Sequence, residues 1–438
     1  MTGIGMLRDR LMCCLLSRGR FDADCYRACN SDLAEFTERE ALRHYVHYGH
    51  REGRVCSDRS IVRWLRSRIN RRGTPVVVVS HEASLTGAPQ TALNICRTLK
   101  ARGFRVLTVL LKDGELCNQF AACGDCVVVS IRYLHRAERI LRRHGARFAL
   151  LNTCVSGCAA PQFRDWGYRV VTLVHEMYET VEACEVAGAK TLAMLEASDW
   201  VVFPSNFVVA DWEANGIRLP ERRVAVMPQG YYRPDIGVAP GEDLGAERAA
   251  LRKSLGLPPD AFVVLGCGMR EARKGADVFF RVAKAVSAEA DNVFFVWVGP
   301  VGLPSFNVEI EASVRSVGKT ARLLPPQDMR EIYRGADLFF LPSRADPFPA
   351  VALEAANCGL PVVYASDSTG VRDVFGGIEG CSLERHDEGG FARLIRKLCA
   401  DPARCRSLGD ACRRAFQGKM MKEDEYVDIL CSAYLRIA

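Results

Sequence analysis

The chain has 438 residues, of which 49% are hydrophobic and 25% are charged. This composition is ordinary for a folded globular protein and excludes general disorder, and the length predicts two or three domains. No apolar run reaches the roughly 18 residues that a transmembrane helix needs. The sequence therefore offers no candidate for a membrane span.

Cysteine is frequent, at 19 residues, but the count is odd and the residues are scattered through expected strands and helices. That pattern favours buried, reduced thiols over a disulfide framework. The pair of Cys123 and Cys126 has no second pair at zinc spacing, and His44, His47 and His50 fit a packed helical face better than a metal site. We therefore expect no bound metal.

The net charge of +7 is concentrated in the first sixth of the chain. Residues 1–74 hold 15 Lys and Arg against 9 Asp and Glu, a net charge of +6, so the remainder is close to neutral. A uniform surface for nucleic acid does not follow, and we expect no nucleic-acid partner. Apolar residues recur at helical spacing between arginines near the end of this segment. The apolar positions are Ile61, Trp64, Leu65 and Ile69, and the flanking arginines are Arg59, Arg63, Arg66 and Arg68.

Two roles fit this basic helix, which ends at the Gly-Thr-Pro break at 73–75. It either packs on the next domain with a solvated basic side or contacts an anionic membrane surface. The opening of the chain has a basic flank like that of a signal peptide, but the apolar stretch at 11–16 is short and no small-residue cleavage site follows. We therefore expect a cytoplasmic protein, with peripheral contact at the cytoplasmic face of a membrane as one role of the basic segment.

After a helical module at 1–73, residues 74–232 alternate strand-like and helix-like patterns. Pro75–Ser80 is a continuous, largely β-branched run, as expected of a strand buried on both faces, and a helical pattern from 90 to 102 follows it. This alternation implies parallel strands joined by right-handed crossovers. Further strands are expected at 105–111, 149–152, 169–174, 200–204 and 223–227.

Residues 233–438 repeat the scheme, beginning with a stretch at 233–260 whose Pro, Gly and charge content is typical of an interdomain linker. The chain is thus predicted to be an α/β protein with two doubly wound, Rossmann-like domains and a cleft between them. Ligands bind outside the carboxyl ends of the strands in such sheets, so functional motifs should directly follow strands. Strands are expected at 262–266, 293–298, 321–324, 337–341 and 361–364, and helices at 276–288, 327–334, 349–358, 390–400 and 423–437.

Two motifs of the first Rossmann-like domain follow strands. In the stretch at 80–89, Gly87 permits close backbone approach, and the free N–H groups of the next helix favour an anion; a small residue there also serves simply to tighten a turn. His175 lies in the stretch at 173–178, directly after an apolar strand. A lone histidine is more often structural, and its place at the expected cleft is what favours a function.

The third motif, at 266–277, lies between a strand and a helix of the second Rossmann-like domain. Lys274 offers a point charge and a neighbouring arginine offers a planar fork to a diphosphate. The alternative is a solvated basic loop. The spacing matches neither a Walker loop nor a Gly-x-Gly-x-x-Gly fingerprint, so ATP and NAD are not indicated.

The fourth motif, at 346–363, is the most specific. Asp346 precedes a predicted helix whose first turn begins at Pro349, and Glu354 lies further along that helix. Two carboxylates eight positions apart can accept hydrogen bonds from separate sugar hydroxyls, while the helix N-terminus supplies donors. The alternatives are a simple N-cap at Asp346 and a surface acid at Glu354.

With these motifs, residues 74–415 resemble the retaining glycosyltransferases of family 4, a large group with the GT-B fold. The strongest match is the paired-acid motif of that family, in which Asp346 replaces the first of two glutamates. The resemblance implies that Glu354 holds the donor ribose and that Asp346 holds the transferred sugar. It also leaves the amides of Phe348 and Ala350 as donors to that sugar.

The resemblance extends to other positions. Lys274 matches the diphosphate clamp of the family, and Arg270 and Arg273 are both candidates for the accompanying arginine because Met269 occupies its usual position. His175 matches the histidine that contacts the donor sugar.

Other parts of the chain resemble components of polysaccharide-synthesising enzymes. The stretch at 80–89 is similar to one subgroup acting on surface polysaccharides, and residues 21–54 resemble a small helical module attached to bacterial polysaccharide glycosyltransferases. The C-terminal helix is expected to pack back on the N-terminal Rossmann-like domain.

The resemblance implies a hexosyltransferase that moves a hexose or deoxyhexose from a nucleoside-diphosphate sugar to a glycan or lipid-linked acceptor, with retention of configuration. Lys274 and a neighbouring arginine stabilise the departing diphosphate, and the acceptor hydroxyl attacks from the front face. No metal or other cofactor is expected, because cationic side chains supply the positive charge.

Two other classes of function remain open. One is a different GT-B enzyme, a nucleotide-sugar epimerase or a phosphorylase. The other is a catalytically degenerate GT-B protein that acts as a binding or scaffold subunit, which the departures from the family pattern at Met269, Asp346 and Pro349 favour. Donor binding without turnover would identify the scaffold.

Overall fold

The computed structural model forms two compact units, here called unit 1 and unit 2. Unit 1 comprises Met1–Phe203, Asn215–Ala225 and Glu423–Ala438, and unit 2 comprises Pro204–Ala214 and Val226–Lys422. The basic helix expected between 59 and 72, with its membrane role, lies outside the described residues, as does His50. None of the helices in the described part of the chain has the length and apolarity needed to cross a bilayer. The structure describes residues 21–49, 52, 54, 56, 73–231, 233–239 and 241–436.

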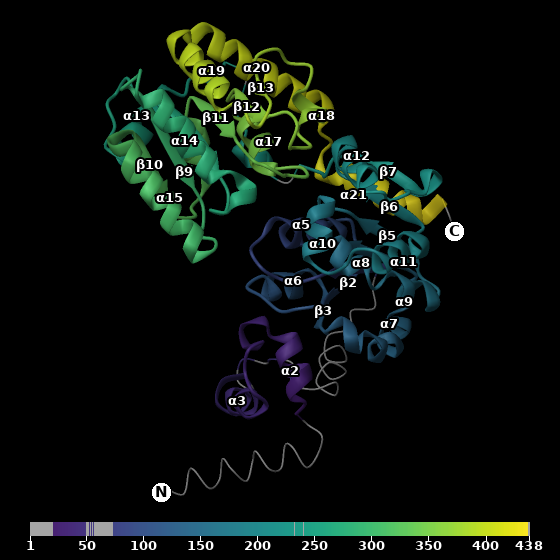
Figure 1. Cartoon of the computed structure of the whole chain (residues 1–438). Coiled ribbons are helices and arrows are strands. Elements are labelled where there is room, and N and C mark those ends of the chain that lie inside the picture. The colour runs from purple at the N-terminus through teal and green to yellow at the C-terminus, as the bar shows by residue number, and fades with distance from the viewer. Residues whose placement is uncertain are drawn as a thin grey trace, which may run out of the picture. The chain divides into compact units, whose positions relative to one another are not determined.

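The first described helices, α2 (Ala23–Cys29) and α3 (Glu38–His44), share a small hydrophobic core of their own (Figure 1). The hydroxyl oxygen of Tyr26, a fully buried side chain, lies 2.9 Å from Nδ1 of His44. A Cβ at Gly49 would lie 2.0 Å from that hydroxyl oxygen, so this packing requires glycine at the position. His44 is thus part of a packed helical core.

Unit 1 contains a seven-stranded sheet with the order β3-β2-β1-β4-β5-β6-β7, and the pairings from β3 to β6 are parallel. β1 (Pro75–Ser80) is buried from its second residue onward because helices cover the sheet, which is why its sequence is continuously apolar. The direction of strand addition reverses between β1 and β4, the point where such sheets bind ligands. The other strands are β2 (Arg105–Leu110), β3 (Asp125–Val128), β4 (Phe148–Asn152), β5 (Arg169–Leu173), β6 (Trp200–Phe203) and β7 (Val224–Val226).

The C-terminal helix α21 (Glu423–Arg436) lies in unit 1, against α5 (Gly87–Ala101). Thr98 donates a hydrogen bond to Glu423, and Nη2 of Arg102 lies 2.7 Å from Oδ2 of Asp428. The remaining helices of unit 1 are α6 (Cys117–Cys123), α7 (Glu138–His144), α8 (Cys154–Gly157), α9 (Ala160–Asp165), α10 (Tyr178–Ala183) and α11 (Ala189–Ala197).

Unit 2 contains a six-stranded sheet with the order β10-β9-β8-β11-β12-β13, in which the direction of strand addition reverses between β8 and β11. Its strands are β8 (Phe262–Cys267), β9 (Val293–Val298), β10 (Ala321–Leu324), β11 (Leu338–Leu341), β12 (Val362–Ala365) and β13 (Ser382–Leu383). Its helices are α12 (Asn206–Ala214), α13 (Gly245–Leu255), α14 (Ala276–Ser287), α15 (Pro304–Val317), α16 (Met329–Gly335), α17 (Ala350–Asn357), α18 (Arg372–Phe375), α19 (Glu388–Ala400) and α20 (Pro402–Lys419).

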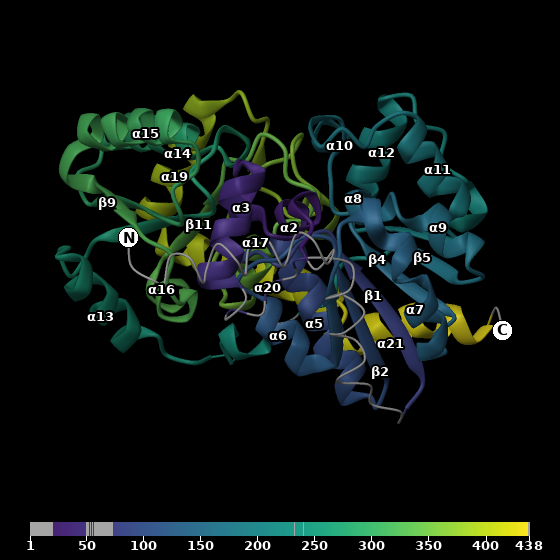
Figure 2. The ribbon, with the colours of Figure 1, turned by 90° about the horizontal axis from the view of Figure 1, so that it is seen from below.

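The helices of unit 2 cover both faces of its sheet. Figure 2 shows α14, α15 and α19 on one face and α13, α16 and α17 on the other. Under α14, the ring of Phe279 meets those of Phe295 and Trp297 edge-on, with centroids 5.3 and 5.2 Å apart. Aromatic packing of this kind buries a large apolar area and fixes the helix on the sheet.

The structure corrects several expectations. The stretch at 233–260 is not a simple linker, because helix α13 lies inside it and packs on α16. The helix was not predicted because charged residues flank its buried Leu251 and interrupt the apolar pattern. The division between units also differs from a single boundary at 232, because the segment Pro204–Ala214 lies in unit 2. The elements α15, α20, β3 and β13 were not predicted.

Candidate functional site

The candidate site in unit 2 lies beyond the carboxyl ends of β8 and β11, where the direction of strand addition reverses. The segments that follow these strands approach closely. The backbone N–H of Arg344 donates to the carbonyl of Arg273 at 2.8 Å. A Cβ at Gly275, whose φ is +72°, would lie 2.1 Å from the carbonyl oxygen of Pro342, so the approach depends on glycine.

An ion pair joins these two segments. Nζ of Lys274 lies 2.7 Å from Oδ2 of Asp346, and the hydroxyl of Ser343 donates to the same oxygen at 3.2 Å. Asp346 is only 3% exposed, whereas the side chain of Lys274 is 20% exposed. A buried carboxylate needs such a partner, and the lysine keeps access to solvent. The structure thus brings together two predicted site residues from separate motifs.

The two arginine candidates have other partners. Nη1 of Arg273 donates to the carbonyl of Ala345 at 3.1 Å, and Nη2 lies 2.8 Å from Oε1 of Glu271. Arg270 is buried, and its Nη1 donates to Oδ1 of Asn307 at 3.0 Å. Arg273 therefore lies beside the backbone of the ion-paired loop, while Arg270 fastens the loop after β8 to α15.

A second ion pair fixes the loop that carries Asp346. Nη1 and Nη2 of Arg344 lie 2.7 and 2.5 Å from the two carboxylate oxygens of Asp277, a bidentate arrangement. Burial raises the pKa of Asp277, but hydrogen bonds from Arg344 and Arg281 outweigh it and lower the pKa below its usual value. The sequence analysis missed this pair, whose members are 67 positions apart and belong to no single motif.

The start of helix α17 differs from the predicted one. Its first residue is Ala350, its N-cap is Pro349, and no side chain caps it. The alternative interpretation of Asp346 as a simple N-cap is therefore wrong, since its carboxylate binds Lys274 instead. Phe348 is buried before the helix, and the uncapped start at Ala350 leaves amide dipoles for an acceptor.

Glu354 lies in α17 beside the hydroxyl of Tyr333, which donates to its Oε2 at 3.0 Å. Burial raises the pKa of Glu354 to about 7, although the hydrogen bond from Tyr333 and the charge of Arg233 lower it. Because Glu354 is part-buried and bonded to a buried tyrosine, it is not a simple surface acid. Tyr333, fully buried in α16, was not predicted as part of the site because nothing in its local sequence marks it.

A separate cluster lies at the carboxyl ends of β1, β4 and β5 in unit 1. Nε2 of His175 lies 2.9 Å from Oδ1 of Asn152, and both its backbone N–H and that of Cys154 donate to Oε2 of Glu176. Burial, with a smaller contribution from His81, lowers the pKa of His175 to about 3. His175 is therefore a neutral imidazole at ordinary pH, suited to hydrogen bonding and not to carrying charge.

The backbone of this cluster is strained at Thr153, a non-glycine residue with φ +137°. Its hydroxyl accepts from the N–H of Ser156 at 3.1 Å and lies 3.4 Å from Nδ1 of His81. Strain of about 1–3 kcal/mol at such a residue persists where surrounding contacts enforce it, and it concentrates at functional sites.

Gly87 is the first residue of α5 and is exposed, with no atom within 4 Å of the position a Cβ would take. The protein's own packing therefore does not require glycine there, and the space beside it is open. As for metal, no group of three or more His, Cys, Asp or Glu side chains in the described ranges has a suitable arrangement.

We expect His175→Gln to make unfolding less sensitive to acid. The folded state holds the imidazole neutral down to a pKa of about 3, while the unfolded chain takes up its proton near pH 6.5, so wild type loses stability as pH falls below 6.5. Between pH 6.5 and 5 the variant should gain up to about 2 kcal/mol relative to wild type. Urea unfolding between pH 6.5 and 5 measures the free energy of unfolding of both proteins, with His386→Gln, at an exposed position, as the control. A difference between His175→Gln and wild type that does not change with pH would contradict the neutral histidine.

Known structures share the fold of this chain. A structure of Anabaena Alr3699/HepE in complex with UDP and glucose aligns with a TM-score of 0.69 at 16% identity, over 83% of this chain and 100% of that one. Sucrose-phosphate synthase from Thermosynechococcus elongatus aligns with a TM-score of 0.67 at 18% identity, over 83% and 99%.

The chain has the GT-B fold. Residues 247–415 also match the family model described as glycosyl transferases group 1, and this range contains Lys274, Asp346 and Glu354. The fold class predicted from the sequence, two Rossmann-like parallel sheets, is confirmed.

Curated relatives match part of the chain. D-inositol 3-phosphate glycosyltransferase 1 of Catenulispora acidiphila is 37% identical over 186 residues, 39% of this chain and 44% of the relative. D-inositol 3-phosphate glycosyltransferase of Salinispora arenicola is 30% identical over 269 residues, 57% and 60% respectively. The chain thus spans about half the length of these two relatives (44% and 60%).

Proposed function

We propose that this protein is a retaining hexosyltransferase that transfers a hexose or deoxyhexose from a nucleoside-diphosphate sugar to a glycan or glycolipid acceptor. The observation that carries the proposal is the pair of Lys274 and Asp346 across the reversal point of unit 2, with Glu354 on helix α17 and its partner Tyr333 on helix α16. Lys274 supplies a cation for the diphosphate of the donor. Asp346 and Glu354 supply carboxylates that can accept hydrogen bonds from the hydroxyls of the sugar and of the ribose.

In this proposal each residue has one task. Lys274 has three N–H donors, so it can contact a diphosphate oxygen while it still contacts Asp346, and it stabilises the charge that grows as the diphosphate leaves. Asp346, held in place by the lysine, accepts hydrogen bonds from hydroxyls of the transferred sugar. Glu354 accepts from the ribose, whose hydroxyls add to the hydrogen bond that its carboxylate already accepts from Tyr333.

Names of similar proteins support a nucleotide-sugar donor and an acceptor of carbohydrate type. The structural neighbour from Anabaena is described in complex with UDP-glucose, and another, WaaG, as a glycosyltransferase involved in lipopolysaccharide biosynthesis. We propose that this chain acts in polysaccharide biosynthesis in the cytoplasm, with contact between the basic segment at 1–73 and the membrane that carries the acceptor as one of the two roles open to that segment. Lys274 and Arg273 supply the positive charge at the diphosphate, so the reaction is proposed to need no metal.

Product analysis tests the proposal. The protein is incubated with UDP-, GDP-, dTDP- and ADP-sugars and bacterial membrane lipids, with and without EDTA, and nucleoside diphosphate release is followed. We expect release from one donor class, unaffected by EDTA, and a product whose anomeric proton shows the donor's configuration. An inverted anomer would refute retention, loss of release in EDTA would refute metal independence, and a free epimerised nucleotide sugar would identify an epimerase.

A further inference from the structure

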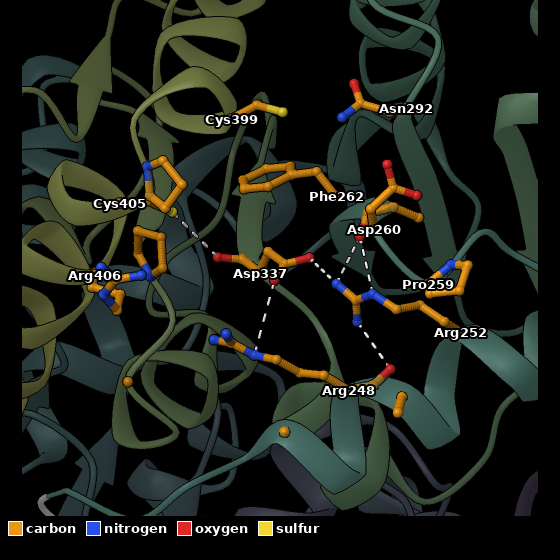
Figure 3. A pocket seen from close by; sticks show the side chains of 16 residues that line it. Arg248, Arg252, Pro259, Asp260, Phe262, Asn292, Asp337, Cys399, Cys405 and Arg406 are labelled. Atoms are coloured by element: carbon orange, nitrogen blue, oxygen red, sulfur yellow. Dashed lines mark hydrogen bonds and ion pairs between the residues drawn. The ribbon is translucent and has the colours of Figure 1, made fainter.

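A pocket lies at the edge of the unit 2 sheet opposite the candidate donor site, at the amino ends of the strands. It has a volume of about 340 Å³, within the range of small-molecule sites. Phe262 begins β8, and Asp337 directly precedes β11, whereas the ion pair of the candidate donor site follows the carboxyl ends of the same strands. Figure 3 shows the side chains around it, contributed by α13, the strand starts and the α19–α20 region.

One acid and one arginine of this pocket satisfy each other. Oδ2 of Asp337 accepts from Nη2 of Arg252 at 2.5 Å and from the backbone N–H of Val263 at 2.7 Å. Arg252 is buried and also donates to the carbonyls of Ala261 and Gly335. This pair therefore holds α13 on the sheet and leaves no net charge for a ligand.

Two further arginines line the pocket without comparable partners. Nε of Arg248 is buried and has no hydrogen bond in the described structure; its nearest acid oxygen, in Asp337, is 3.9 Å away. Arg406 on α20 is exposed, and no hydrogen bond or ion pair of its guanidinium is found among the described residues. In Figure 3 the guanidinium end of Arg248 is directed toward the side where Arg406 lies.

The rest of the lining is neutral apart from the carboxylate of Asp260. Asp260 and Asn292 lie on the side of the pocket away from Arg406, with the half-buried ring of Phe262 between (Figure 3). The pocket thus has a cationic end, an apolar middle and an end that can bind hydroxyls. Guanidinium groups bind phosphate and carboxylate through parallel N–H donors.

We propose that this pocket binds a small anionic, hydroxylated metabolite whose phosphate or carboxylate group lies between Arg248 and Arg406. The site shares no residue with the proposed donor site, because the two lie at opposite edges of one sheet. The proposal therefore does not rest on the proposed function. A ligand there contacts α13, α20 and the strand starts together, so its binding stabilises unit 2.

Calorimetric titration at constant ionic strength tests the proposal, with inorganic phosphate, glucose 1-phosphate and glucuronate as probes. We expect saturable binding of at least one probe, weakened about tenfold or more by Arg248→Ala and by Arg406→Ala. Arg414→Ala, an exposed arginine on the same helix α20, is the matched control and should bind as wild type does. Preference for glucose 1-phosphate or glucuronate assigns the anionic group.

Two outcomes would overturn the proposal. One is the absence of saturable binding of all three probes. The other is binding that Arg406→Ala leaves unchanged and Lys274→Met abolishes, which would place the anion in the proposed donor site and leave the proposed function intact.

Discussion

Replacing Lys274 with methionine should lower kcat by about a hundredfold or more, the effect expected when one preorganised group that stabilises developing charge is removed. The ammonium group is the cation nearest the buried Asp346, at 2.7 Å, and methionine keeps most of the side chain's volume without its charge. Donor turnover measured under saturating conditions checks this. Near-normal turnover would remove Lys274 from the chemistry.

The same substitution should also destabilise unit 2, because it leaves the carboxylate of Asp346, only 3% exposed, with Ser343 as its remaining hydrogen-bond donor in the described structure. A double-mutant cycle separates the two effects. Lys274→Met alone should lower the free energy of unfolding by about 3 kcal/mol, and addition of Asp346→Asn should recover part of that loss. Activity should stay low in the double variant, and additive stability effects would contradict the ion pair.

Replacing Glu354 with glutamine should make the ligand-free protein more stable and should lower its affinity for the donor. Burial raises the pKa of Glu354 to about 7, so ionising it in the folded state is unfavourable, and glutamine accepts the hydrogen bond of Tyr333 without that charge. Above pH 7 the variant should unfold with a free energy up to about 3 kcal/mol higher than wild type. Its affinity for the donor should nevertheless fall, since the proposed ribose acceptor loses its charge.

The pH dependence gives the sign of this effect. A carboxyl group whose folded pKa is raised favours folding in its protonated form, so wild type loses stability as pH rises from about 4.5 to about 7, and the two proteins should match below pH 4.5. Chemical denaturation at pH 4.5, 6 and 8 measures the difference. Glu331→Gln, at an exposed position of α16, is the control and should change stability little. If wild type were as stable at pH 8 as at pH 4.5, the raised pKa of Glu354 would be contradicted.

Local sequence patterns predicted the parts of the fold that local physics determines. The continuous β-branched run of β1 is typical of a strand covered on both faces, and α14 shows its apolar side clearly, with Phe279, Val282 and Val286 buried. Short or strongly charged elements were missed. β13 has two residues, and the apolar positions of α20 are interrupted by arginines.

The candidate site likewise contains residues that local motifs predicted and residues that only tertiary packing brings together. Lys274, Asp346 and Glu354 were predicted because each belongs to a motif that follows a strand. Tyr333, the partner of Glu354, and Arg344, the partner of Asp277, were not predicted, because residues 21 and 67 positions apart meet only through tertiary packing. The hydrogen bonds of Arg270 to Asn307 and of Arg273 to Ala345 likewise join positions that are far apart in the sequence.

The most direct test of the central claim, a nucleoside-diphosphate sugar bound at Lys274, Asp346 and Glu354, is thermal unfolding with UDP, GDP, dTDP and ADP and their common sugars. A ligand at 100 times its dissociation constant should stabilise the folded state by about 2.7 kcal/mol. We predict a rise in Tm with one nucleotide class in wild type and in Arg414→Ala, and none in Glu354→Ala. A rise of equal size in Glu354→Ala, or no rise with any nucleotide, would contradict the proposed donor site.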